Sequence, residues 1–160
     1  MSTDYIVSSL PALQFDAPAP ISWESFAEMC GGEESIDGLL AQRGWPDLET
    51  QLRNAMAEAR GGAKYVRPAT GCSVYWKHRV GACFQEFDVA AREKLIDKVW
   101  WDAAGELAQP ASPLGKGALA AYAVRLRIAL RRSSISQERG NAVFDGITSG
   151  TKIDFLPAQP

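Results

Sequence analysis

One uninterrupted stretch, residues 83–107 (CFQEFDVAAREKLIDKVWWDAAGEL), constrains the fold of this chain more than any other. It holds no proline, and its one glycine, Gly105, lies near the end, so nothing in it breaks a helix. At 1.5 Å per residue, such a helix would be about 37 Å long. Apolar residues recur at helical spacing along its second half and form one broad face: Leu95, Ile96, Val99, Trp100, Ala103 and Leu107. We therefore expect a central helix that different neighbours cover along its length.

Helix start signals divide the rest of the chain into further helical segments. Ser22 is suited to cap one helix, and Pro46 to stand in the first turn of another. Ser112 followed by Pro113 has the pattern of an N-cap and a first helical residue. Outside the central helix, the predicted helices are 23–30, a short one after Ser35, 46–60, about 114–132, and 136–147 with Val143, Phe144 and Ile147 inward. Residues 61–82 are expected to be a loop that contains a β-like run at 74–76 and forms either a short strand or a turn of helix.

These patterns predict an all-α fold, a compact helical bundle with two long helices and several short ones. A chain of 160 residues with 46% apolar residues suits one domain with its own core. We expect a single helical domain over residues 1–147 and a C-terminal tail over 148–160. The residues expected to share its core are Leu95, Val99, Trp100, Leu119, Tyr122 and Leu126.

Composition excludes several classes of protein. No apolar run approaches the ~18 residues of a membrane span, so membrane insertion is not expected. The N-terminus lacks the basic start and the small-residue cleavage site of a signal peptide. The three cysteines, an odd number, predict no disulfide framework. We therefore expect a cytoplasmic protein in a reducing environment.

No motif in the chain predicts catalysis, a metal or a cofactor. The only histidine, His78, lies between Cys72 and Cys83, but a zinc site would need a fourth ligand, which Cys30 could supply only through the fold. No glycine-rich sequence has the spacing of a phosphate-binding loop. We accordingly expect no metal, no cofactor, no small-molecule substrate and no enzymatic activity.

Charge is unevenly divided along the chain. Residues 1–60 carry ten acidic and three basic residues, a net −7, whereas residues 61–160 carry nine acidic and fourteen basic ones, a net +5. The carboxylates of Glu93 and Asp97 lie one helical turn apart, each beside a lysine, and we interpret them as a solvated helix face.

Four arginines stand out on the last long predicted helix: Arg125, Arg127, Arg131 and Arg132. Residues 114–135 contain no acid, so their charges must meet water, the acidic N-terminal half or a partner. The planar guanidinium of arginine suits carboxylate and phosphate partners. A pI near 5.5 argues against nucleic acid, so we interpret these arginines as candidate contacts to another protein.

Several stretches, taken in order, resemble a bacterial family that is encoded beside the genes of V-type (vacuolar or archaeal-type) ATPases. Their order carries the resemblance, which covers most of residues 4–147. The matching stretches are YIVSSLPAL at 5–13, PISWESF at 20–26, EKLIDKVW at 93–100, AYAVRL at 121–126 and ERGNAVF at 138–144. In the third, Glu93, Asp97 and Trp100 fit the Glu-x3-Asp-x2-Trp pattern of the central helix of that family.

Such proteins are similar to the C-type subunit of V-type ATPases (the d-type subunit in eukaryotes), a helical socket between the membrane rotor and the central stalk. The resemblance implies a non-catalytic accessory or coupling subunit of an ATPase that pumps protons or sodium ions. It also implies a position at the cytoplasmic face of the membrane, held there by stalk or rotor subunits. This chain is shorter than the C-type subunit and lacks its threefold internal repeat. The alternative is a free-standing cytoplasmic module that binds protein or nucleic acid, such as an assembly factor.

Overall fold

The computed structural model describes residues 1–135 and 137–150, and these contain helices and connecting segments but no strand. The α-helices are α1 (Thr3–Ser9), α2 (Trp23–Cys30), α3 (Glu33–Gln42), α4 (Trp45–Ala59), α5 (Val74–Cys83), α6 (Val89–Ala104), α7 (Lys116–Ser134) and α8 (Gln137–Gly150). Two short 3-10 helices, η1 (Ala63–Tyr65) and η2 (Gly105–Leu107), follow α4 and α6. The prediction of an all-α bundle is confirmed.

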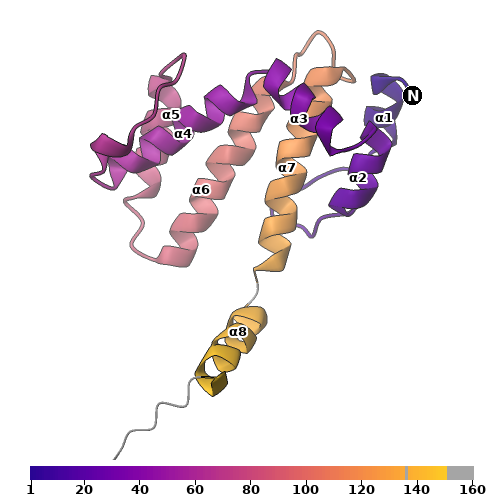
Figure 1. Ribbon diagram of the computed structural model, residues 1–160. Coiled ribbons are helices and arrows are strands. Elements are labelled where there is room, and N and C mark those ends of the chain that lie inside the picture. The colour runs from indigo at the N-terminus through magenta and orange to yellow at the C-terminus, as the bar shows by residue number, and fades with distance from the viewer. Residues whose placement is uncertain (136, 151–160) are drawn as a thin grey trace, which may run out of the picture.

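Helices α6 and α7 pack against each other at the centre of the molecule (Figure 1). Helices α4 and α5 pair on one side of them, and α1, α2 and α3 lie against α7 on the other. Gly117, in the first turn of α7, lies so close to η2 that an added Cβ would stand 2.2 Å from the carbonyl oxygen of Leu107. Only glycine permits this approach, which fixes the return of the chain from α6 into α7.

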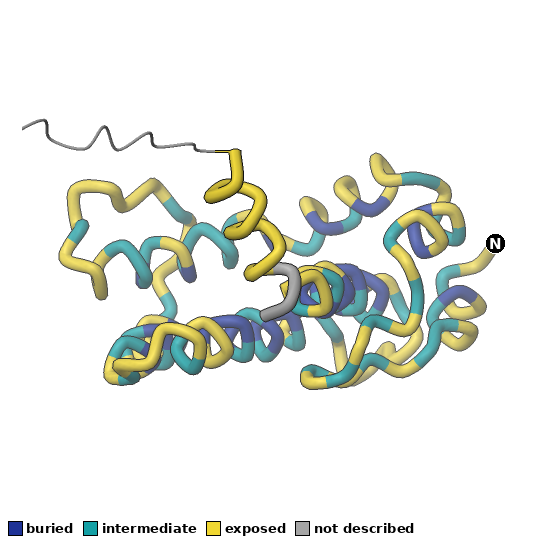
Figure 2. The backbone as a smooth tube through the Cα atoms, turned by 90° about the horizontal axis from the view of Figure 1, so that it is seen from below, coloured by how far each residue is buried: buried dark blue, intermediate teal, exposed yellow. Residues whose placement is uncertain are grey.

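The core is centred on the facing sides of α6 and α7 (Figure 2). Val99, Leu119 and Leu126 are buried there as expected, while Trp100 and Tyr122 are half-buried against the same cluster. The prediction for Leu95 is wrong, because its side chain is 45% exposed. Trp101 is buried instead, since a segment of the N-terminal region covers that side of α6.

The predicted central helix over residues 83–107 is wrong in its continuity. The chain turns at residues 84–88, between α5 and α6. Asp88 caps α6, because its side chain accepts a hydrogen bond from the backbone N–H of Ala91 at 2.8 Å. A capping aspartate offers the backbone an alternative to a continuing helix, so it begins a new one.

The predicted loop over residues 61–82 is wrong in its last part, because residues 74–83 form the helix α5, which is longer than the single helical turn expected as the alternative to a strand. Ser73 caps this helix by accepting a hydrogen bond from the backbone N–H of Trp76 at 3.3 Å. Trp76 and Val80 are buried against neighbouring helices. Tertiary packing here overrides the strand propensity of three β-branched or aromatic residues in a row.

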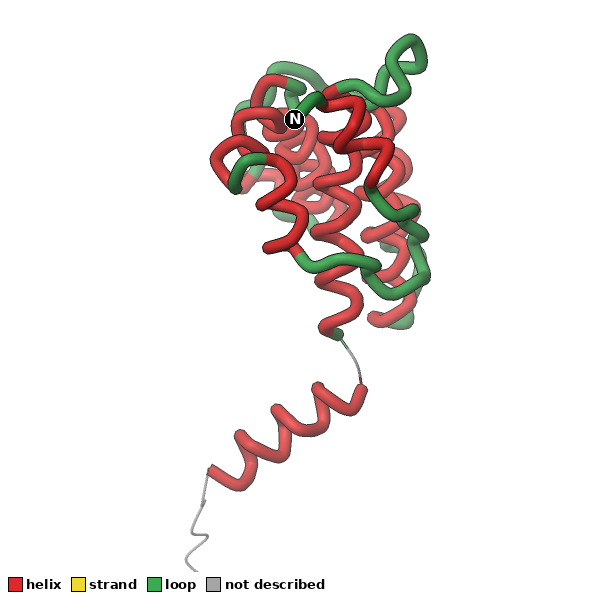
Figure 3. Tube along the Cα trace, turned by 90° about the vertical axis from the view of Figure 1, so that its right-hand side faces the viewer, coloured by secondary structure: helices red, strands yellow, loops and turns green. Residues whose placement is uncertain are grey.

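The last described helix, α8, extends from the end of α7 away from helices α1–α7 (Figures 1 and 3). A helix in this region was predicted, but the inward placement of its apolar residues is not observed. Val143 and Phe144 are 64% and 65% exposed, and Ile147 is also exposed. The helix continues to Gly150, and the rest of the predicted tail lies outside the described residues.

None of the helices within residues 1–135 and 137–150 combines the length and the apolar character that crossing a bilayer requires.

Candidate functional site

Two of the four candidate arginines, Arg127 and Arg131, point to one side of α7 and are exposed. Arg127 forms an ion pair with Asp37 of α3 at 2.9 Å, and its guanidinium lies 4.5 Å from the ring centre of Trp23. Arg131 forms an ion pair with Asp97 of α6. Both arginines therefore meet acids of this chain, yet they keep much of their surface in water.

The other two, Arg125 and Arg132, are half-buried on a different side of α7. The Nε–H of Arg125 donates to the backbone carbonyl of Trp101 at 3.1 Å, and the guanidinium lies 5.4 Å from the ring centre of Trp101. Burial lowers the pKa of Arg125 below its usual value. Arg132 contacts Asp97 and Asp16, each at 3.2 Å. These two arginines stabilise the fold of the chain itself.

A non-helical N-terminal segment, with a turn at residues 14–17, covers this second side of the α6–α7 pair. The ring of Phe15 meets Trp101 edge-on at 5.6 Å, and the guanidinium of Arg132 lies 4.4 Å from the centre of the Phe15 ring. The next residue, Asp16, forms ion pairs with Arg132 and with Lys94 of α6, each at 3.2 Å. We call this side of the helix pair the covered side. There, Phe15 and Asp16, which are adjacent in sequence, pack on Trp101 and Arg132.

Asp97 joins the two sides of the helix pair. It is 5% exposed, and its carboxylate contacts both Arg131 and Arg132. Its interpretation as part of a solvated face is wrong, whereas Glu93 is exposed as expected. Two arginines compensate the cost of burying this charge. The sequence signals for this contact were the adjacent arginines at the end of one predicted helix and the acid at position 97 on another. Sequence spacing alone could not show that these residues meet.

On the first side, helices α4, α6 and α7 enclose an open groove of about 360 Å³. Its floor is apolar, and the contributing residues are Trp45, Met56, Ile96, Trp100, Val124 and Ile128. Its rim is charged, with buried Asp97 beneath it; the rim residues are Glu49, Arg53, Glu93, Arg127 and Arg131. We call this the open groove. An apolar floor with a charged rim is the arrangement of a surface that receives an amphipathic segment.

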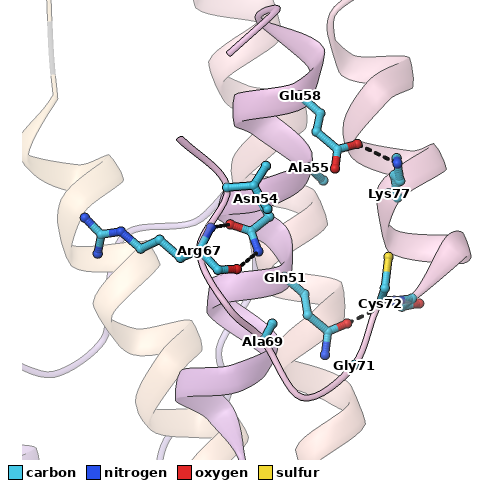
Figure 4. Close-up of a pocket in the computed structure, with 11 residues that line it drawn as sticks. Gln51, Asn54, Ala55, Glu58, Arg67, Ala69, Gly71, Cys72 and Lys77 are labelled. Atoms are coloured by element: carbon cyan, nitrogen blue, oxygen red, sulfur yellow. Dashed lines mark hydrogen bonds and ion pairs between the residues drawn. The ribbon is translucent and has the colours of Figure 1, made fainter. Parts of the chain in front are cut away.

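A second, smaller pocket of about 200 Å³ lies between α4, the loop after η1 and the start of α5 (Figure 4). Side chains of α4 hold this loop by its backbone. Asn54 both accepts from the N–H of Arg67, at 2.8 Å, and donates to its carbonyl oxygen, at 2.7 Å. Gln51 accepts from the N–H of Ser73 at 3.0 Å. The amides of Asn54 and Gln51 are therefore engaged in holding the loop on α4.

The thiols and the histidine do not gather. Cys83 is buried, Cys30 is half-buried, and both Cys72 and His78 are exposed. Within the part of the chain that the structure describes, no three His, Cys, Asp or Glu side chains lie close enough to hold a metal ion. Burial raises the pKa of the Cys30 and Cys83 thiols, which disfavours the nucleophilic thiolate.

Comparisons of the chain with protein-family models, with curated proteins and with solved structures find no match.

Proposed function

We propose that this protein is a non-catalytic docking subunit and that the open groove receives a segment of another protein. The observation that supports this most directly is the groove itself. Half-buried Trp100 and Met56 line it beside exposed Arg53 and Arg127. Tryptophan and arginine are the residues that most often dominate the energy of protein interfaces, the first through buried area and the second through planar hydrogen bonding.

The identity of the partner comes from the sequence resemblance. We propose stalk or rotor subunits of a V-type ATPase, with the chain bound at the cytoplasmic face of the membrane through them. A segment with an apolar face and flanking carboxylates fits the groove, since the exposed rim arginines favour carboxylates. The attraction between these arginines and the carboxylates of the partner should mainly speed and orient the association of the two proteins. No small-molecule substrate, cofactor or nucleic acid takes part in this proposal.

Native pull-down from cells that carry the ATPase tests the proposal. Tagged protein should capture stalk or rotor subunits, identified by mass spectrometry, and capture should weaken as salt rises. The double variant Arg53→Glu/Arg127→Glu should lose most of this capture, because both side chains are exposed at the rim. Arg131 and Arg132 are unsuitable for this test, since both hold buried Asp97.

A matched control is Lys64→Glu/Lys116→Glu, which changes the net charge equally at exposed positions outside the groove. The control should capture ATPase subunits like the wild type. Capture that both double variants retain would reject the groove as the docking surface. Reproducible capture of a defined partner unrelated to the ATPase would instead support a free-standing binding or assembly module.

A further inference from the structure

The dipeptide Phe–Asp occurs three times in this chain, and its three copies have different surroundings. Phe15–Asp16 is seated on Trp101 and Arg132. In Phe87–Asp88, the acid is engaged as the N-cap of α6. In the third copy, on α8, Phe144 is 65% exposed, and the carboxylate of Asp145 contacts no cation among the described side chains, which are those of residues 1–135 and 140–150.

Helix α8 is poorly suited to stand alone in water. It has 14 residues, and isolated helices of that length are marginal even with strong helix formers. Three of its residues are glycines, each costing up to about 1 kcal/mol relative to alanine in a helix interior. Its exposed Val143 and Phe144 would gain from burial. The stability of this helix therefore calls for a surface that covers its apolar side.

The open groove repeats the chemistry on which Phe15–Asp16 is seated. Trp100 and Arg131, which line the groove, directly precede Trp101 and Arg132 of the covered side in sequence. A helix that places the ring of Phe144 against Trp100 turns the next residue, about 100° around the helix, toward the rim. The exposed rim arginines Arg53, Arg127 and Arg131 are the cations that a carboxylate there can reach. Groove and helix are thus complementary in apolar surface, and Asp145 competes for these arginines with the acids that already pair with them, Glu49, Asp37 and Asp97.

We propose that α8 of a second copy of this chain binds in the open groove, with Phe144 on Trp100 and Asp145 at the arginine rim. The donor is a second copy because α8 leads away from helices α1–α7 of its own chain (Figure 3). Exchange is reciprocal in a twofold dimer, so each copy gives one helix and receives one, which doubles the buried area. Such a dimer covers the groove until a partner protein displaces α8.

Disulfide trapping of the full chain tests the contact directly. In a Cys72→Ser background, which removes the exposed thiol, Met56→Cys in the groove is combined with Val143→Cys on α8, which leaves the Phe144 anchor in place. Mild oxidation should give a covalent dimer on non-reducing gels. The matched control combines Met56→Cys with Phe87→Cys, at the phenylalanine that is 95% exposed, and should stay monomeric. A disulfide within one chain would overturn the proposal in favour of α8 folding back, and no disulfide would reject the groove as its site.

Sedimentation velocity over a range of concentrations supplies the second measurement. The wild type should dimerise, and Phe144→Ser should raise the dimer dissociation constant at least about thirtyfold, as expected for an aromatic anchor. Phe87→Ser should leave it unchanged. A monomeric wild type, or equal effects of the two serine variants, would overturn the proposal. Both measurements use purified protein alone, so they can fail while ATPase capture succeeds, or succeed while it fails.

Discussion

The two sides of the α6–α7 pair carry similar residues but differ in what covers them. On the covered side, Phe15 and Asp16 of the chain itself are seated on Trp101 and Arg132. On the other, Trp100 and Arg131 line the open groove. Two adjacent tryptophans on α6 and two adjacent arginines on α7 thus supply one residue each to two different surfaces. The comparison also shows which chemistry satisfies such a surface: an aromatic ring followed by a carboxylate.

The largest expected effect comes from the core beneath both sides. Leu126 is fully buried, so Leu126→Ala should lower the free energy of unfolding by about 2–5 kcal/mol through lost burial and an added cavity. Urea unfolding followed by far-UV circular dichroism measures it. Leu95→Ala is the control, and because Leu95 is 45% exposed it should cost less than about 1 kcal/mol. Equal losses in the two variants would mean that the core is not centred on α7.

The next effect concerns Asp97, the residue that both sides share. Asp97→Asn keeps the side-chain volume but removes the charge that holds Arg131 and Arg132, so it should cost about 3 kcal/mol. Glu93→Gln, one turn away and exposed, is the matched carboxyl-to-amide control and should change stability little. Calorimetry on both variants decides. If Asp97→Asn were as stable as the control, the two sides would be energetically independent.

Sequence reasoning predicted the part of this fold that rests on local signals. Helical spacing, the capping residue Ser22 and the first-turn proline Pro46 are signals that depend on neighbours in the chain, and the helices that they mark are present. It failed where distant segments decide the outcome. Nothing near Leu95 says that α6 is rotated to bury Trp101, because the covering Phe15 lies far away in sequence.

The candidate site could be predicted only in part for the same reason. The four arginines were recognisable, and the acidic N-terminal half was one of the expected destinations of their charge, which Asp37 and Asp16 provide. The division into two half-buried and two exposed arginines needed the packing of α7. The groove needed three helices in place, since its floor combines residues from α4, α6 and α7.

A smaller effect is the pH dependence of stability that Tyr122 should give to the covered side. The hydroxyl of Tyr122 donates to the carbonyl oxygen of Pro11 at 2.9 Å, and burial raises the pKa of Tyr122 to about 12. The unfolded chain loses this proton near pH 10, so the contribution is fully present below about pH 10 and is lost as pH rises toward 12. Tyr122→Phe should cost about 1 kcal/mol at neutral pH, the usual net worth of one hydrogen bond.

Urea unfolding of both proteins between neutral pH and about pH 11 measures the alkaline loss. The wild type should lose more stability than Tyr122→Phe over the alkaline part of that range, because the variant has no proton to release there. Parallel curves would show that Tyr122 does not hold the N-terminal segment through its hydroxyl.

The smallest effect separates the two sides by their exposed acids. Asp16 and Asp37 are 60% and 66% exposed, and each pairs with one of the α7 arginines. Removing either charge, with Asp16→Asn or Asp37→Asn, should therefore cost only about 0.2–1 kcal/mol, and less as salt rises from about 0.05 M to about 1 M. Global stability alone would not tell the variants apart.

A local probe distinguishes them, because the backbone N–H of Ala19, in the covering segment, donates to the hydroxyl of Ser133 at 3.4 Å. Hydrogen exchange at Ala19 should become faster in Asp16→Asn and stay unchanged in Asp37→Asn, since only Asp16 helps to hold that segment on α7. Faster exchange in both variants would show that the two sides are coupled through the arginines, and the covered side could then no longer serve as an independent precedent for the occupant of the groove.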